Sequence, residues 1–192
     1  MGTVPIVPAL SCYKIGQVAE SLIKVAYPTL LQKPQPFPID KFFEKDLPAL
    51  LGYDYAVQEL PHGIEGATDP VEKEVVLSPD TYDLLLEGNG RARFTACHEI
   101  GHVILHARFL RERLLDGRST VKLHRSNIPP YKDPEYQADA FASALLMPTI
   151  HVQNLLKRGV TSGNLASIFR VSKQAAEVRV AKLNLFLKIK DY

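Results

Sequence analysis

The hydrophobic positions of this chain change period along its length, and this change predicts helices at both ends with a short sheet between them. Residues 15–32 place apolar side chains at helical spacing, and a second helix is expected over 39–52, beyond a proline-rich connector. Short β-prone runs follow at 53–60, 64–68 and 73–78, separated by turn residues. These three runs predict a small antiparallel meander.

The second half of the chain returns to helical spacing. A long helical run covers 91–115, and a polar, proline-containing connector follows at 116–132. The run DPEYQADAFASALLMP at 133–148 carries clear helix boundaries, because Asp133 can cap the first turn and Pro134 suits the first helical position. Further helical runs come after this segment. We therefore predict an α+β protein.

The last strong helix stop, Pro148, also suggests a division of the chain. Residues 1–148 are predicted to form the main domain, and 149–192 a helical C-terminal extension packed on it. Composition is that of an ordinary globular protein, with 46% hydrophobic and 23% charged residues over 192 positions. The net charge of +2 is too small to argue for a nucleic acid or an acidic membrane as partner.

The sequence gives no indication of disulfide bonds, of a membrane span or of secretion. Cys12 and Cys97 do not make a disulfide framework, and no apolar run is long enough to span a membrane. The N-terminal residues lack the basic and apolar regions of a secretory signal. A cytoplasmic location is therefore expected.

The stretch ACHEIGHVILH carries the candidate chemistry. On a helix, His98 and His102 differ by about 40° in direction and lie one turn apart, so both imidazoles can reach one metal ion. Glu99 lies about 100° from His98 and about 60° from His102, so it can flank the metal without binding it. From there it could take a proton from a water molecule that the metal activates. Zinc, one ion per chain, is the expected metal. The simpler alternative is a helix whose histidines are only hydrogen-bonded.

A catalytic zinc site needs a third protein ligand. His106 is rejected, because it lies about 12 Å along the helix axis from His98, and a packing or capping role is expected for it. Glu135 on the 133–148 helix is the better candidate. The alternative for Glu135 is an acidic residue in the first turn of a helix, which the helix dipole favours.

The face of the 133–148 helix that carries Glu135 supports the ligand interpretation. Asp139 follows one turn later, where it could accept the outer N–H of a zinc-bound histidine and fix its tautomer. Ala138 and Ala142 lie on the same side and would allow a close approach to another helix. Gly101, a costly residue inside a helix, is the expected point of contact on the histidine helix.

The stretches RFTACHEIGHVILH and EYQADAFASALLMP together closely resemble the ImmA/IrrE family of metallopeptidases. The resemblance implies a zincin-like core in which the small antiparallel sheet packs on the HExxH helix. It also implies that His98, His102 and Glu135 bind the metal and that Glu99 is the catalytic base. Family members cleave a helix-turn-helix transcriptional repressor and so derepress stress-response or mobile-element genes, which implies the same substrate class here.

The substrate is expected to lie extended along an edge strand of the 53–78 region. The sequence does not choose the group that stabilises the oxyanion. Four residues are available by type: His62, His124, Tyr131 and Tyr136.

The C-terminal segment 164–183 resembles a helix-turn-helix. Four of its cations could touch phosphates, namely Arg170, Lys173, Arg179 and Lys182. The small net charge, and Arg170 in place of the usual turn glycine, favour a helical pair packed on the main domain instead. Two alternatives to a peptidase thus stay open: a DNA-binding regulator with a structural or sensory metal, and an inactive protein-binding module. Retention of Glu99 favours the peptidase, because a structural site has no use for a base.

Overall fold

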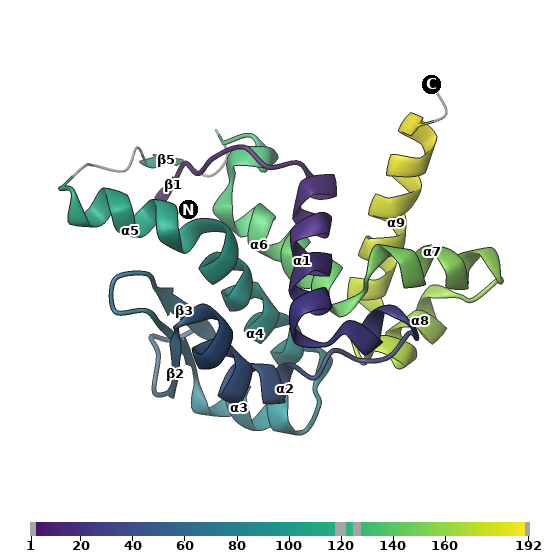
Figure 1. Cartoon of the computed structure of the whole chain (residues 1–192), viewed down its shortest axis with the longest axis horizontal. Coiled ribbons are helices and arrows are strands. Elements are labelled where there is room, and N and C mark those ends of the chain that lie inside the picture. The colour runs from purple at the N-terminus through teal and green to yellow at the C-terminus, as the bar shows by residue number, and fades with distance from the viewer. Residues whose placement is uncertain (1–2, 118–121, 125–127, 191–192) are drawn as a thin grey trace.

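The computed structural model describes residues 3–117, 122–124 and 128–190 (Figure 1). Five strands occur in the described residues: β1 (Thr3–Pro5), β2 (Asp54–Val57), β3 (Gly66–Asp69), β4 (Glu74–Leu77) and β5 (Lys122–His124). The helical segments described are α1 (Cys12–Ala26), η1 (Pro28–Leu31), α2 (Ile39–Lys41), η2 (Phe42–Leu51), α3 (Pro79–Leu86), α4 (Gly90–His102), η3 (Val103–Ala107), α5 (Arg108–Leu115), η5 (Pro130–Lys132), α6 (Pro134–Leu146), α7 (Thr149–Lys157), α8 (Ser162–Phe169) and α9 (Lys173–Lys190). The prediction of an α+β protein is confirmed.

Of the helices expected in the first half, the one predicted over 15–32 is observed as α1, which begins three residues earlier and ends six residues earlier. α1 starts at a serine cap, where the side chain of Ser11 accepts a hydrogen bond from the backbone N–H of Lys14. It ends before Pro28, which opens the short 3₁₀ segment η1 instead of continuing the helix. The helix expected over 39–52 is present as α2 and the π-helical η2, and it ends at Gly52, whose φ of 65° a glycine adopts without strain.

The small sheet is mixed, so the prediction of an antiparallel meander is wrong. The strand order is β2-β4-β3, with β2 parallel to β4 and β3 antiparallel to it. β4 is the most apolar of the three, and Val75, Val76 and Leu77 are all buried. Because a central strand is covered on more sides than an edge strand, β4 takes the middle. Residues 58–65 connect β2 to β3, and β3 forms the edge of the sheet opposite β2.

Two helices, α4 and α6, lie side by side at the centre of the molecule (Figure 1). The two helices approach each other closely at Gly101, where an added Cβ would lie 3.1 Å from the Cα of Ala138 and 3.2 Å from its carbonyl oxygen. The expected contact between Gly101 and the alanine face of the second helix is therefore confirmed. α1 packs against α6, and β3 packs against α4.

The long helix expected over 91–115 is interrupted in its middle. α4 and α5 are joined by the π-helical segment η3, which follows directly after His102. Single turns of π-helix inside α-helices often occur at functional sites. In this chain η3 contains His106, whose side chain is 1% exposed.

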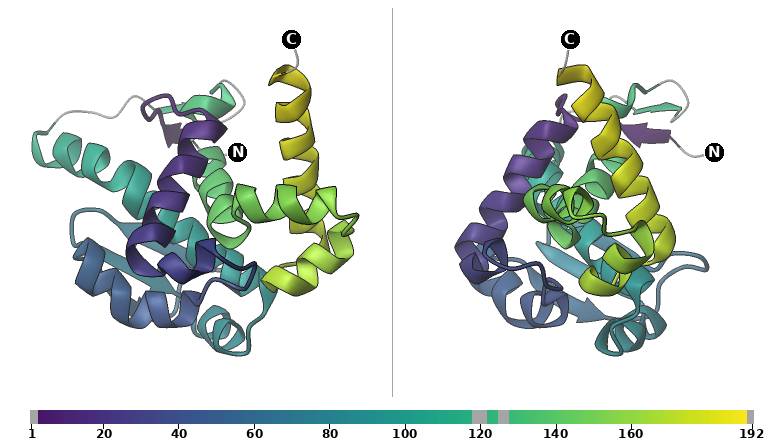
Figure 2. Two further views of the ribbon diagram at one scale, coloured as in Figure 1. Left: turned by 45° about the vertical axis from the view of Figure 1, so that its right-hand side comes forward. Right: turned by 90° about the vertical axis from the view of Figure 1, so that its right-hand side faces the viewer.

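The C-terminal helices α7, α8 and α9 group on one side of the molecule, and the end of α9 stands away from it (Figure 2). The turn between α8 and α9 packs on the start of α4. A Cβ on Gly90 would lie 2.8 Å from the backbone nitrogen of Ser172, and Arg93 Nε donates to the carbonyl of Arg170 over 3.0 Å. The boundary at residue 148 stays a prediction.

One cation proposed for phosphate contact is not available for it. Arg179 is 8% exposed, and its guanidinium donates to the carbonyl of Met147 and to the hydroxyl of Thr149. Burial lowers the pKa of Arg179 to about 10. The side chain anchors α9 to the end of α6, because a cation inside the protein needs acceptors there. None of the described helices is both long and apolar enough to cross a bilayer.

Candidate metal centre

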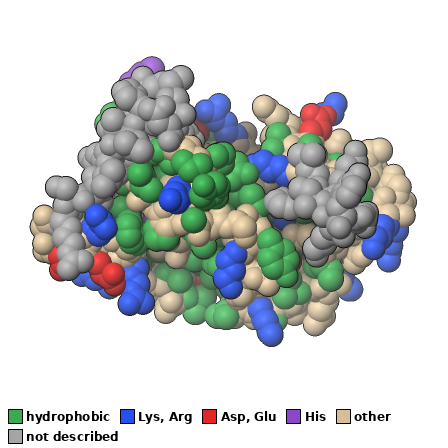
Figure 3. Space-filling model, turned by 90° about the horizontal axis from the view of Figure 1, so that it is seen from above, with side chains coloured by type: hydrophobic (Ala, Val, Ile, Leu, Met, Phe, Trp, Pro, Cys, Tyr) green, Lys and Arg blue, Asp and Glu red, His purple; other side chains and the backbone are tan. Residues whose placement is uncertain are grey.

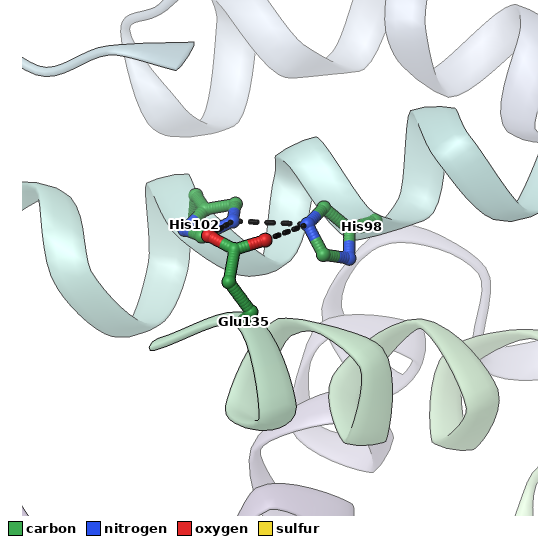
Figure 4. A group of neighbouring side chains, drawn as sticks. All are labelled: His98, His102 and Glu135. Carbon is green, nitrogen blue, oxygen red and sulfur yellow. Dashed lines mark hydrogen bonds and ion pairs between the residues drawn. The ribbon is translucent and has the colours of Figure 1, made fainter. Parts of the chain in front are cut away.

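His98 and His102 occupy successive turns of α4 and point to the same side (Figure 4). Their Nε2 atoms are 3.0 Å apart, and both side chains are 17% exposed. The α4 helix begins at Asn89, whose side chain accepts hydrogen bonds from the N–H groups of Arg91 and Ala92. The predicted spacing of one turn therefore places both imidazoles at one point.

Glu135 reaches that point from the first turn of α6. Asp133 caps this helix by accepting from the N–H of Glu135, and Pro134 occupies the first helical position, as predicted. The Glu135 carboxylate lies 3.3 Å from His98 Nε2 and 3.5 Å from His102 Nε2 (Figure 4). One ligand atom from each of the three residues falls within 4.8 Å of the others. Two imidazole nitrogens and one carboxylate oxygen are a donor set that fits catalytic zinc.

Asp139, one turn further along α6, contacts the other side of His98. Its Oδ1 lies 2.9 Å from His98 Nδ1. A carboxylate at this distance accepts the Nδ1 proton and leaves the Nε2 lone pair directed towards a metal. Asp139 therefore contacts the outer nitrogen of a predicted histidine ligand. Its role in orienting the His98 ring stays a prediction.

His106 lies outside the group of possible ligands, as expected from its distance along the helix. Its ring is nevertheless part of the site. His106 Nδ1 lies 3.1 Å from His102 Nδ1, and His106 Nε2 lies 3.0 Å from Oε1 of the buried Gln137. Sequence analysis missed Gln137. Its position two residues after Glu135 gave no signal, since that spacing points away from the Glu135 face of a helix.

Glu99 is buried beside β3. The residue is only 7% exposed. Thr68 Oγ1 donates a hydrogen bond to Glu99 Oε2 over 2.7 Å. Gly66, two residues before Thr68 on the same face of the strand, leaves space for this carboxylate: an added Cβ would lie 3.0 Å from Glu99 Cγ. Sequence analysis identified neither Thr68 nor Gly66, because only the strand pairing brings them to the α4 helix.

A pocket of about 260 Å³ opens over these residues. His98, Glu99, His102 and Glu135 line it together with residues of β3. Among the candidates for oxyanion stabilisation, the three whose side chains are described, His62, Tyr131 and Tyr136, do not line it. His62 is exposed on a loop, Tyr131 is half exposed, and the hydroxyl of Tyr136 contacts Cys12; the side chain of His124 lies outside the described residues.

The charges of the site are strongly coupled. Burial by itself would lower the pKa of His98, but the hydrogen bonds to Asp139 and Glu135 outweigh it and raise that pKa to about 10. Burial and the neighbouring His98 lower the pKa of His102. Burial also raises the pKa of Glu99, although the hydrogen bond from Thr68 acts in the opposite direction. Such opposed shifts in one pocket are typical of functional sites.

The fold and the site together define a metallopeptidase-type protein: an HExxH helix beside an edge strand, with a glutamate from a second helix. The family model described as the IrrE N-terminal-like domain, a peptidase family, matches residues 71–181. The chain belongs to this family, the ImmA/IrrE metallopeptidases.

A solved structure described as a Mycobacterium tuberculosis transcriptional regulator is similar in fold, with a TM-score of 0.57 and 12% sequence identity. The similarity covers 85% of this chain and 45% of that one, so the chain spans less than half the length of the regulator. At this identity the likeness shows the fold alone. No curated protein matches the sequence.

Proposed function

We propose that this chain is a zinc-dependent endopeptidase that cleaves a helix-turn-helix transcriptional repressor and so derepresses stress-response or mobile-element genes. Membership of the metallopeptidase family supports the reaction class. The observation that carries the proposal is the position of Glu99. Its buried carboxylate borders the same pocket as His98, His102 and Glu135, although it is not among the possible ligands. A site that only held a structural metal would have no use for it.

In the proposed reaction His98, His102 and Glu135 would hold the zinc. When bound, zinc polarises the peptide carbonyl and makes a water molecule more acidic. Glu99 accepts the proton of that water as it attacks the carbonyl carbon. Glu99 then delivers the proton to the leaving amine, so the peptide bond breaks and the base is regenerated. Asp139 keeps the Nδ1 proton on His98 throughout.

The proposed substrate path follows β3. Within the described residues this strand pairs with β4 alone, so its other edge is the place where an extended peptide could add as a further strand. Gly66, Ala67 and Thr68 of β3 also line the pocket. A peptide added to this edge would therefore pass beside Glu99. Extended binding requires a locally unfolded or loop segment of the repressor.

Direct DNA binding by the C-terminal helices is the weaker alternative. Arg179 is buried, and Lys173 lies 3.8 Å from Glu177. Lys182 lies over the ring of Tyr136, 4.8 Å from its centroid. On the face shown in Figure 3, Lys and Arg side chains are scattered among apolar ones and do not form one patch. These observations favour a helical pair that packs on the main domain. None of them favours the other part of this alternative, in which the metal acts as a sensor.

The proposal is tested with purified, zinc-loaded protein and helix-turn-helix repressors from the same genome. Wild type is expected to cleave the repressor at one site, identified by mass. Glu99→Gln is expected to bind zinc equally and to lose cleavage. Glu112→Gln is the matched control, because Glu112 is an exposed glutamate on the continuation of the same helix. Normal cleavage by Glu99→Gln would show that the proposed mechanism is wrong.

A further inference from the structure

We infer that His106 and Gln137 are positioning residues for the metal: they hold His102 in the tautomer whose Nε2 lone pair faces the zinc. The inference rests on the proposed metal site. It deepens that site, because it gives a role to a third histidine that binds no metal. A chain of hydrogen bonds runs from two backbone carbonyls through Gln137 and His106 to His102.

The first step fixes the orientation of the Gln137 amide. Gln137 is fully buried, and its Nε2 donates to two backbone carbonyls, that of Pro8 over 2.9 Å and that of Tyr131 over 2.8 Å. Both acceptors lack a proton, so the amide nitrogen must face them. The amide oxygen Oε1 therefore points in the other direction, where it lies 3.0 Å from His106 Nε2.

The second step fixes the proton on His106. An amide oxygen only accepts, so His106 Nε2 must carry the hydrogen. In the neutral imidazole the other nitrogen, Nδ1, then has a bare lone pair. This atom lies 3.1 Å from His102 Nδ1. His102 must therefore donate from Nδ1, and its Nε2 lone pair is left for a metal.

The opposite tautomer of His102 would conflict with this chain. It would place two bare Nδ1 lone pairs 3.1 Å apart at a position where His106 is 1% exposed. Such a pair of unsatisfied buried acceptors is unfavourable. It would also place a proton on His102 Nε2, which lies 3.0 Å from His98 Nε2 at the point where the metal is expected.

The two histidine ligands are thus oriented by different means. His98 is held by the carboxylate of Asp139, and both side chains reach solvent in part. His102 is held by a neutral chain that lies in the core and ends on the backbone at residues 8 and 131. A neutral chain fixes the tautomer without bringing another negative charge beside Glu99 and Glu135.

The first test is the tautomer itself, read in the full-length, metal-free protein by two-bond ¹⁵N–¹H correlations of the histidine rings. Signals of His102 are assigned by their loss in His102→Ala. Wild type is expected to show the Nδ1–H form of His102 and the Nε2–H form of His106. An Nε2–H form of His102 would overturn the inference, whatever the peptidase activity of the protein.

The second test is zinc affinity, measured by competition with a chelator. His106→Leu removes the acceptor and is expected to weaken zinc binding roughly 10- to 100-fold. His106→Asn is expected to restore most of the affinity, because an asparagine oxygen can take the place of Nδ1 as acceptor. His151→Leu is the matched control, since His151 is also buried but its Nε2 donates to the carbonyl of Leu30, away from the metal ligands. This variant is expected to lose stability and keep zinc affinity.

The outcomes separate the two proposals. Equal zinc affinity in wild type, His106→Leu and His106→Asn would overturn the positioning role while leaving the metal site intact. Equal affinity in wild type and a His98→Ala, Glu135→Ala double variant would show that the metal site itself is wrong, and the tautomer spectrum would still decide the hydrogen-bond chain. If His106→Leu does not fold, the wild-type spectrum and His106→Asn remain decisive.

Discussion

The hydroxyl of Thr68 is expected to support catalysis by holding the carboxylate of Glu99. Thr68→Val keeps the shape of the side chain and its β-branch but removes the donor that contacts Glu99 Oε2 over 2.7 Å. Glu99 is 7% exposed, so water has little access to replace the lost hydrogen bond. A hydrogen bond to a charged group contributes roughly 1.5–3 kcal/mol. Because Glu99 takes up a proton during the step, that amount is an upper limit for the transition state, and kcat is expected to fall by up to roughly 10- to 150-fold.

The assay compares kcat and KM of zinc-loaded wild type, Thr68→Val and Thr68→Ser on the repressor. KM and zinc content are expected to stay the same for Thr68→Val, because the backbone of β3 and the ligands are untouched. Since the hydrogen bond from Thr68 lowers the pKa of Glu99, its loss should also move the acidic limb of the kcat profile to higher pH. Thr68→Ser keeps the hydroxyl and should restore most of the rate.

The reasoning would be refuted if Thr68→Val had the kcat of wild type and an unmoved acidic limb. Such a result would mean that the carboxylate of Glu99 is positioned by other contacts. A parallel fall in Thr68→Val and Thr68→Ser would instead point to a steric effect at β3 and would equally contradict a role for the hydrogen bond.

Three further predictions concern the helices and the metal. Gly101→Ala should destabilise the fold by about 1–3 kcal/mol, because its Cβ would lie 3.1 Å from the backbone of Ala138; an unchanged thermal midpoint would contradict this close packing. Asp139→Asn should weaken zinc binding roughly 10- to 100-fold in a chelator competition, and unchanged affinity would remove the orienting role. The pKa of His98 in the metal-free site is raised to about 10, so zinc must displace its proton near neutral pH. Zinc affinity should therefore rise by about tenfold per pH unit until the pH reaches that pKa. Calorimetry in buffers of different ionisation enthalpy should detect about one proton released per zinc ion bound. A zinc affinity that does not change with pH would show that His98 is already neutral.

The proposed extended binding of the substrate rests on the edge strand, whereas the proposed repressor class rests on the family. β3 is an edge strand of the described sheet, its Thr68 contacts Glu99, and a pocket of about 260 Å³ is small for a folded domain. Cleavage should therefore require a repressor segment that can become extended.

The amino-acid sequence by itself determined the features that depend on neighbouring residues. The spacing of His98 and His102 on one helix, the cap at Asp133 and the stop at Gly52 all follow from local geometry, and each is present. Small residues at Gly101 and Ala138 also predicted which faces of the two helices meet. Such features can be predicted from the sequence because each depends on residues only a few positions apart along the chain.

Only the tertiary structure decided which distant elements meet. The three β-prone runs were visible, but their order was not, because a central position goes to the strand that the whole core covers best. That order brings Thr68 to Glu99, and a separate long-range packing brings Gln137 to His106. Arg179 looked like a surface cation because charge alone does not reveal burial. Contacts between distant segments depend on the competition of all segments for burial, and no local pattern encodes that competition.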